Sequence, residues 1–206
     1  MKRMSWTLAV ALLTVAGANA GPTEFDFSDP KGVNGIHLQL DTPLEPIAGI
    51  AGGVSGKVTF DPAAPEKTTG YIEVQTGEIA FISPMMTKVA RGADWLQIDL
   101  HPDVRFDVRE VIEVRKGEGE GRLVLKVRGD FECKGVKKSL VTDVSVHSLP
   151  GRMGDRVQKA KGDLLVLRAE FTVKRTDFGL KQDPGFLLVS DDVQIRFAIV
   201  GHAPSK

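Results

Sequence analysis

The residues that could carry out chemistry are few and widely spaced in this sequence. None of its four histidines stands at a paired metal-ligand spacing; they are His37, His101, His147 and His202. The single Cys133 excludes an internal disulfide, a thiolate zinc cluster and an iron–sulfur site, because each needs at least two cysteines. Asp191-Asp192 offers carboxylates to a cation, but two carboxylates before a strand are more often a solvated turn. We therefore expect no catalytic residue, no metal ligand and no protein-bound cofactor, although distant histidines can still meet in space.

A glycine-rich segment, Gly49 to Lys57, is superficially similar to a phosphate-binding loop. That loop would need Gly where Ala51 stands and Ser or Thr where Val58 stands, and no helical pattern follows. Ser55 lacks the Gly-x-Ser-x-Gly context and the strand-to-helix turn of an esterase nucleophile. We interpret the segment as a loop that enters a strand.

The N-terminus has the pattern of a secretory signal peptide. Lys2 and Arg3 precede an apolar stretch from Trp6 to Ala16, and Ala18-Asn19-Ala20 provides a cleavage site with small residues. The apolar stretch is roughly half the ~20 residues that span a bilayer, and no Cys follows it for a lipid anchor. We predict that residues 1–20 are removed and that the mature chain, without a transmembrane segment, lies in the periplasm. That chain has two fewer basic than acidic side chains and no basic stripe, which disfavours nucleic-acid binding.

The rest of the chain alternates between apolar and polar residues, which is the pattern of half-buried strands. Eight such segments occur, at residues 36–40, 54–60, 71–75, 104–114, 122–128, 140–146, 165–173 and 193–199. The pair Val111-Ile112 breaks the alternation and predicts a bulge. Glycine-containing turns at 117–121 and 134–137 separate neighbouring strands. A stretch around residues 84–96 does not alternate, and Pro84 at its start indicates a short helical segment.

These elements predict an all-β fold in which residues 21–206 form one antiparallel domain. Eight antiparallel strands with one apolar face each can close into an up-and-down barrel or stack as a sandwich. A barrel in the outer membrane would need aromatic girdles, whereas the whole chain has one Tyr and two Trp. Its polar faces are densely charged, as at Arg122, Lys126 and Arg128. We therefore favour a barrel with apolar residues inside and polar residues outside.

Several motifs in a fixed order resemble those of the YceI-like family. They are His101–Phe106, Gly129–Lys138 and Lys174–Leu180, supported by Val58–Pro62, Asp94–Leu96 and Asp191–Ile195. The resemblance covers roughly residues 35–200 and departs at the N-terminal end, where Asn34-Gly35-Ile36-His37 replaces the His-Ser pair usual in the family. It implies a single antiparallel eight-stranded lipocalin-like barrel in an exported bacterial protein. It also implies a long isoprenoid or quinone-like lipid, bound non-covalently inside the barrel, and a homodimer is possible.

An apolar chain in such a barrel would be held by burial, at roughly 25 cal/mol per Å², without directional chemistry. The candidate lining residues are Phe60, Ile72, Val74, Trp95, Phe106, Val108, Leu123, Leu125, Leu167, Phe171, Phe178, Ile195 and Phe197. They could equally pack against each other as a dry core. Arg175, Asp177 and Phe178 could lie at the rim of the barrel mouth, but we favour a structural corner in which Arg175 and Asp177 pair.

Three hypotheses for function follow. The leading one is a non-catalytic periplasmic binding or carrier protein for a long-chain isoprenoid or quinone-like lipid. The second is a scaffold with a filled core whose strands or loops bind another envelope protein. The third is a small enzyme or haem-associated redox protein that uses a histidine such as His101.

Overall fold

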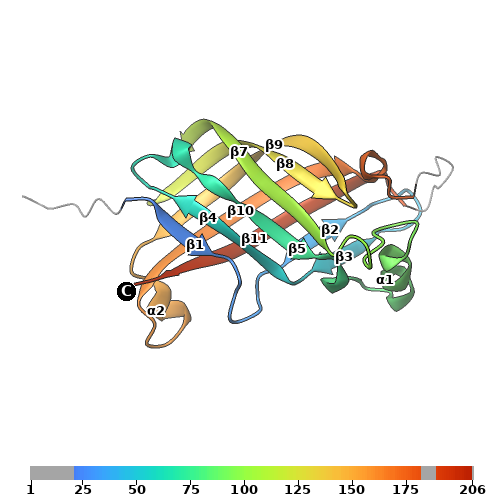
Figure 1. The fold of residues 1–206 in the computed structure, drawn as a ribbon, viewed down its shortest axis with the longest axis horizontal. Coiled ribbons are helices and arrows are strands. Elements are labelled where there is room, and N and C mark those ends of the chain that lie inside the picture. The colour runs from blue at the N-terminus through green and yellow to red at the C-terminus, as the bar shows by residue number, and fades with distance from the viewer. Residues whose placement is uncertain (1–20, 182–188, 206) are drawn as a thin grey trace, which may run out of the picture.

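The computed structural model describes residues 21–181 and 189–205, so the predicted signal peptide lies outside the described residues (Figure 1). Eleven strands form within them: β1 (Thr23–Asp26), β2 (Ile36–Gln39), β3 (Ala48–Ala51), β4 (Val54–Phe60), β5 (Thr69–Gln75), β6 (Ile79–Phe81), β7 (Asp103–Lys116), β8 (Arg122–Cys133), β9 (Val136–Leu149), β10 (Gly162–Lys174) and β11 (Asp192–Pro204). The helices are α1 (Pro84–Arg91), α2 (Met153–Arg156) and the 3-10 turns η1 (Pro65–Lys67), η2 (Thr76–Glu78) and η3 (Arg175–Phe178).

Eight of these strands close into an antiparallel barrel. The ring runs β1-β4-β5-β7-β8-β9-β10-β11, and it closes where Asp26 of β1 pairs with His202 of β11. Each neighbouring pair in this ring is antiparallel. The predicted all-β, eight-stranded barrel is therefore confirmed, and the sandwich is excluded.

Three strands of the barrel are interrupted. β2 pairs with β11 on the same edge as β1, with Leu38 opposite Ile195, and β3 and β6 follow it in the sheet order. Because β3 leads into β4 and β6 follows β5, the pairs β1/β2, β3/β4 and β5/β6 each act as one broken strand. The alternation predicted β2, β4 and β5 but missed β1, β3 and β6. β1 (TEFD) has one apolar residue, and β3 (AGIA) and β6 (IAF) have no polar side chain, so none of the three shows an alternation.

The predicted bulge, β8–β9 turn and helical segment are all present in the structure. The β7–β8 register shifts between Val108 and Glu110 and again between Val111 and Glu113, which confirms a bulge at Ile112 and adds a second at Arg109. A two-residue turn joins β8 to β9, with positive φ at Lys134 (49°) and Gly135 (72°). The helical segment predicted around residues 84–96 is present as α1, but the helix ends at Arg91 and turns follow it. Ser83 caps α1 by accepting from the Met86 backbone N–H at 3.4 Å.

One end of the barrel is filled with side chains. Phe25, Phe27, Phe60, Leu165 and Ile199 are buried in one cluster there, which we call the plug. The ring of Phe27 lies 2.6 Å from where a Cβ on Gly201 would stand, so this strand position has room only for glycine. Figure 1 shows α2, β1 and the C-terminus at this end and α1 at the opposite end.

Polar contacts fasten the β1–β2 connection over the plug. The Asn34 side-chain amide donates to the carbonyls of Phe27 and Val200, both at 3.0 Å, and its oxygen accepts from the Val200 N–H at 2.9 Å. Asp29 forms a two-point ion pair with Arg156 of α2, at 2.7 and 2.8 Å. The plug end is therefore held by packing and by hydrogen bonds.

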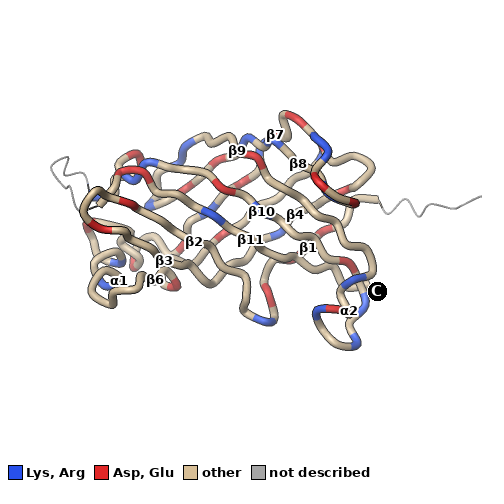
Figure 2. The backbone as a smooth tube through the Cα atoms, turned by 180° about the vertical axis from the view of Figure 1, so that it is seen from behind, with Lys and Arg blue, Asp and Glu red and all other residues tan. Residues whose placement is uncertain are grey.

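Charges of both signs alternate along the strands, as Figure 2 shows. Several pair along or across strands; Arg105, for example, contacts Glu73 of the neighbouring β5 and Asp107 of its own strand, both at 2.9 Å. Such exposed or half-exposed pairs contribute little stability, about 0–1 kcal/mol each. They leave the outer face polar, while the apolar side chains of the same strands point inward.

Candidate functional site

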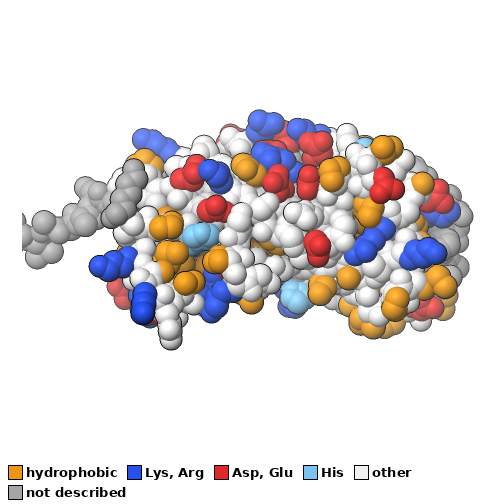
Figure 3. All heavy atoms as spheres, turned by 60° about the horizontal axis from the view of Figure 1, so that its bottom comes forward, with side chains coloured by type: hydrophobic (Ala, Val, Ile, Leu, Met, Phe, Trp, Pro, Cys, Tyr) orange, Lys and Arg blue, Asp and Glu red, His pale blue; other side chains and the backbone are white. Residues whose placement is uncertain are grey.

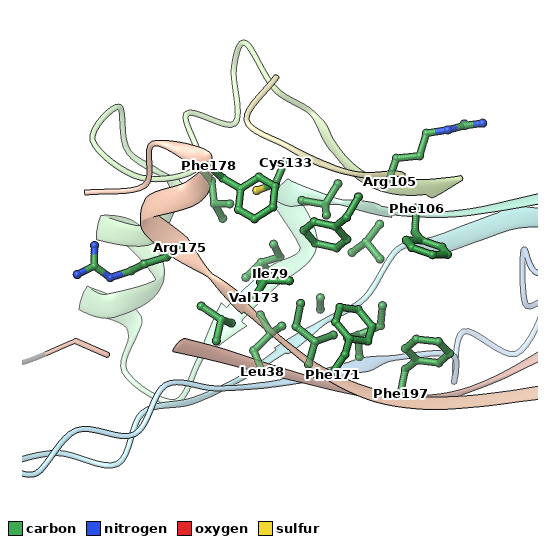
Figure 4. A pocket seen from close by; sticks show the side chains of 18 of the residues that line it. Leu38, Ile79, Arg105, Phe106, Cys133, Phe171, Val173, Arg175, Phe178 and Phe197 are labelled. Atoms are coloured by element: carbon green, nitrogen blue, oxygen red, sulfur yellow. The ribbon is translucent and has the colours of Figure 1, made fainter. Parts of the chain in front are cut away.

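A cavity of about 610 Å³ lies inside the barrel, between the plug and the end that carries α1. Its wall is almost entirely apolar and includes side chains from β2, β5, β7, β8, β9, β10 and β11. In Figure 4, Phe106, Phe171 and Phe197 face a common space, with Ile79, Leu38 and Cys133 around it. Two edge-to-face contacts order the aromatic rings, Phe131–Phe171 at 6.1 Å and Phe131–Phe178 at 5.3 Å between centroids.

Most of the candidate lining residues stand on this wall. Eleven of the thirteen border the cavity: Ile72, Val74, Trp95, Phe106, Val108, Leu125, Leu167, Phe171, Phe178, Ile195 and Phe197. Phe60 is 1% exposed and belongs to the plug, and Leu123 packs against the same cluster. Contact of any of them with a ligand stays a prediction.

Part of the wall comes from segments that were not predicted to contribute. Ile79 and Phe81 of β6 line the cavity, and Met85, Met86 and Val89 of α1 line its α1 end. Met85, Met86, Val89 and Ala90 have the three- and four-residue spacing of an apolar helix face. That spacing is the signal that could have assigned α1 to the cavity.

The β9–β10 ladder runs only from Leu149–Leu164 to Val144–Ala169. Beyond it, residues 170–174 of β10 pair with β11, and residues 136–143 of β9 pair with β8. The Phe131, Phe171 and Phe178 side chains pack together near this part of the wall. In this region side chains, rather than a backbone ladder between β9 and β10, complete the enclosure of the cavity.

Thr142 and Cys133 bring polar groups to the cavity wall. Thr142 of β9 is 8% exposed and lines the cavity, and its hydroxyl has no hydrogen-bond partner among the described residues. Cys133 of β8 also lines the cavity, and burial raises the pKa of its thiol to about 12, although the nearby Lys134 acts in the opposite direction. A thiol with this pKa is protonated at neutral pH, so it is a poor nucleophile and a poor metal ligand.

η3 forms a corner at the rim of the cavity. Arg175 is 4% exposed, and its guanidinium donates to the carbonyls of Ser190 (3.0 Å), Leu180 (2.9 Å) and Lys181. The guanidinium also lies 5.5 Å from the centre of the Trp95 ring. The predicted corner is present, but the predicted Arg175–Asp177 pair is not. Arg175 binds backbone carbonyls, because three of them converge on the planar guanidinium and its donors. It thereby holds the segments around residues 180 and 190 and positions Trp95 at the rim.

Apart from Cys133 and Arg175, the titratable residues singled out in the sequence lie away from the cavity. Asp191 accepts from the Thr176 backbone N–H and hydroxyl at 3.0 and 2.8 Å, and Asp192 pairs with Lys174 at 3.0 Å. His101 packs its ring beside Gly135 at the β8–β9 turn, outside the cavity wall. Within residues 21–181 and 189–205, no group of three or more His, Cys, Asp or Glu side chains could hold a metal ion.

The chain matches the family model of the YceI-like domain over residues 33–201. It shares its fold with BcnA of Burkholderia cenocepacia, at 18% identity and a TM-score of 0.65 over 81% of this chain and 95% of that one. A YCEI protein of Campylobacter jejuni is similar at 18% identity and a TM-score of 0.58, over 77% and 84% of the two chains.

A polyisoprenoid binding domain from Saccharophagus degradans, implicated in plant cell wall breakdown, is similar at 11% identity and a TM-score of 0.63, over 89% of this chain and 99% of that one. No curated protein matches the chain. In the part of the chain that the structure describes, no helix has the length and apolar character needed to cross a membrane.

Proposed function

This chain belongs to the YceI-like domain family, and from that premise we propose that it is a non-catalytic protein that holds a long-chain isoprenoid or quinone-like lipid in its barrel. The observation that carries the proposal is the apolar cavity of about 610 Å³. Its volume lies within the range of about 300–1,000 Å³ that is usual for ligand sites. Protein interiors pack at crystal-like density with few voids larger than a water molecule, so a filled scaffold core would leave no such space.

The shape of the cavity favours a linear ligand. On β8 alone its wall extends from Leu125 to Cys133, which corresponds to roughly 20 Å along the barrel axis at ~3.3 Å per residue and a strand tilt of ~40°. The plug closes one end, so a ligand enters beside α1 and its chain terminus stops near the plug. Each buried CH₂ contributes about 0.8 kcal/mol, so affinity should increase with chain length until the cavity is full.

The ligand class, location and role of the protein are parts of the same proposal. The fold is shared with a domain described as polyisoprenoid binding, which supports an isoprenoid or a quinone with an isoprenoid tail. The signal-peptide pattern of residues 1–20 supports export to the periplasm. An aqueous compartment between two membranes requires a protein that shields long apolar chains, and a blind apolar barrel meets this requirement.

Trp95 provides a direct test, because it lines the cavity and is the one tryptophan in residues 21–206. Quinones quench indole fluorescence on contact, so ubiquinone added to the protein should quench Trp95 saturably at one ligand per chain. A polyprenol of matched length should then reverse the quenching by competition. A tryptophan signal that neither ligand changes would contradict the proposal, and so would ubiquinone quenching that stays unsaturable and that polyprenol does not reverse. The Trp95→Phe variant gives the signal-free control.

A further inference from the structure

Apolar side chains project into solvent around the open end of the cavity. Ile82 is 88% exposed, Met85 71% and Val89 49%, and Leu44 on the β2–β3 loop is 64% exposed. We call Leu44, Ile82, Met85, Lys88 and Val89 the α1 rim. Single exposed apolar residues are normal on protein surfaces, but Figure 3 shows hydrophobic side chains gathered at the end of the molecule where α1 lies. A gathered patch of this kind marks a contact surface.

The α1 rim is continuous with the cavity. Met85 and Val89 line the cavity and are also exposed to solvent, and Glu45 and Ile47, which follow Leu44, reach the cavity wall as well. An apolar chain that leaves the barrel beside α1 would therefore pass over apolar side chains as far as the surface. Such a path is useful only if another apolar phase lies against it.

The charge around α1 indicates which kind of apolar phase can lie against the α1 rim. Residues 82–92 contain Lys88 and Arg91 and no acidic residue, while the β2–β3 side of the rim carries the exposed acid Glu45 next to Leu44. Arg91 is engaged internally, donating to the Ile79 carbonyl at 3.0 Å, whereas Lys88 is exposed and has no ion pair with any described residue. Exposed apolar side chains beside an unpaired lysine form the pattern that binds the interface of a bilayer with anionic lipids.

We propose that the α1 rim docks on the surface of an anionic phospholipid bilayer, so that the lipid passes between membrane and cavity without crossing water. This inference rests on the proposed function, because it assigns the place where the ligand is loaded and released. In the docked state Ile82, Met85, Val89 and Leu44 enter the headgroup region and Lys88 faces lipid phosphates. The cavity then opens directly onto the bilayer.

Flotation with vesicles tests the docking. The protein should float with vesicles of phosphatidylethanolamine and phosphatidylglycerol, and the double variant Ile82→Asp/Met85→Asp should bind them at least about tenfold more weakly. An aspartate at position 85 stands in the first turn of α1, where the helix dipole favours it, so the fold is retained. Val33→Asp is the matched control, because Val33 is 68% exposed but lies on the β1–β2 loop, which contacts α2 at the far end through Asp29. This control should float like the unaltered protein.

The lysine is tested separately. Lys88→Gln should weaken binding to the anionic vesicles roughly fivefold and leave binding to phosphatidylcholine vesicles unchanged, and salt should reduce the difference. Lys31→Gln, a change at an exposed lysine on the β1–β2 loop, should have no effect.

Three results would overturn the docking: no flotation of the unaltered protein, equal flotation of the Asp double variant, or a dimer in solution that the double variant dissociates without any binding to vesicles. Quenching of Trp95 by ubiquinone added from detergent distinguishes a failure of the docking from a failure of the proposed function. If quenching persists without flotation, only the docking is wrong. If quenching is also absent, the proposed function itself is wrong.

Discussion

Filling the cavity should separate ligand binding from folding. Val144 of β9 lines the cavity, between Leu125 of β8 and Ala169 of β10, and it is only half-buried although it lies on the inner face. The change Val144→Phe places a ring in open space. At about 24 cal/mol per Å³ of cavity filled, the roughly 50 Å³ added by the ring stabilises the empty protein by about 1 kcal/mol, less any rotamer strain.

The same ring takes the place of ligand. It displaces a volume of chain equal to about two CH₂ groups, which at ~0.8 kcal/mol each removes about 1.6 kcal/mol of binding free energy, or roughly 15-fold in Kd. Unfolding in urea measures the stability of the empty protein, and quenching of Trp95 by ubiquinone measures the affinity.

Leu165→Phe is the matched control, because Leu165 is fully buried in the plug. Overpacking there should cost about 1–3 kcal/mol of stability and leave ligand affinity unchanged. The reasoning is refuted if Val144→Phe destabilises the protein as much as Leu165→Phe does, because the site would then be filled already. It is also refuted if Val144→Phe binds ubiquinone as tightly as the unaltered protein.

Three further predictions concern single side chains. Burial alone would raise the pKa of Asp29, but hydrogen bonds from Arg156 and from two backbone N–H groups outweigh it and lower that pKa to about 2. Because folding lowers this pKa, the ionised carboxylate stabilises the folded protein at pH values above the unfolded pKa of 3.8. About 2 kcal/mol of the free energy of unfolding should therefore be lost as the pH falls from ~4 to ~2. In urea unfolding at these pH values, Asp29→Asn should lack this decrease in stability, and an equal decrease would contradict the assignment. Thr142→Val should tighten polyprenol binding roughly fivefold in the competition assay, because it removes an unpartnered hydroxyl from the apolar wall; weaker binding would show that the hydroxyl bonds the ligand. The Cys133 thiol, with a pKa raised to about 12 by burial, should react with a thiol reagent at pH 8 far more slowly in the folded than in the unfolded protein, and equal rates would show that it is accessible.

The long strands could be predicted because their pattern is local. β7 to β11 have twelve to fourteen residues each, enough for the alternation to show, and glycine-containing turns separate β7 from β8 and β8 from β9. β3, in contrast, contains Gly49, which by itself disfavours a strand. In the fold the ring of Phe81 lies 2.8 Å from where a Cβ on Gly49 would stand, so that residue must be glycine for β3 to pair with β6. This requirement comes from a contact distant in sequence, which local propensity does not register.

The sequence predicted which side chains point into the barrel, but not how far along the barrel axis each of them lies. Alternation correctly placed Phe60, Leu123 and Phe106 on the inside of the barrel, because every second residue of a strand points the same way. These three side chains differ in their positions along the barrel axis. Phe60 and Leu123 lie at the plug end, whereas Phe106 lies at the cavity. The axial position depends on strand tilt and stagger, which the closed ring fixes as a whole.

Native mass spectrometry of the protein purified from a periplasmic extract, followed by organic extraction of the bound material, tests the central claim most directly. We expect one long-chain isoprenoid or quinone-like lipid per chain, and we expect the Val144→Phe variant, prepared in parallel, to retain less of it. A protein that has its bare polypeptide mass and takes up neither added polyprenol nor ubiquinone would contradict the account.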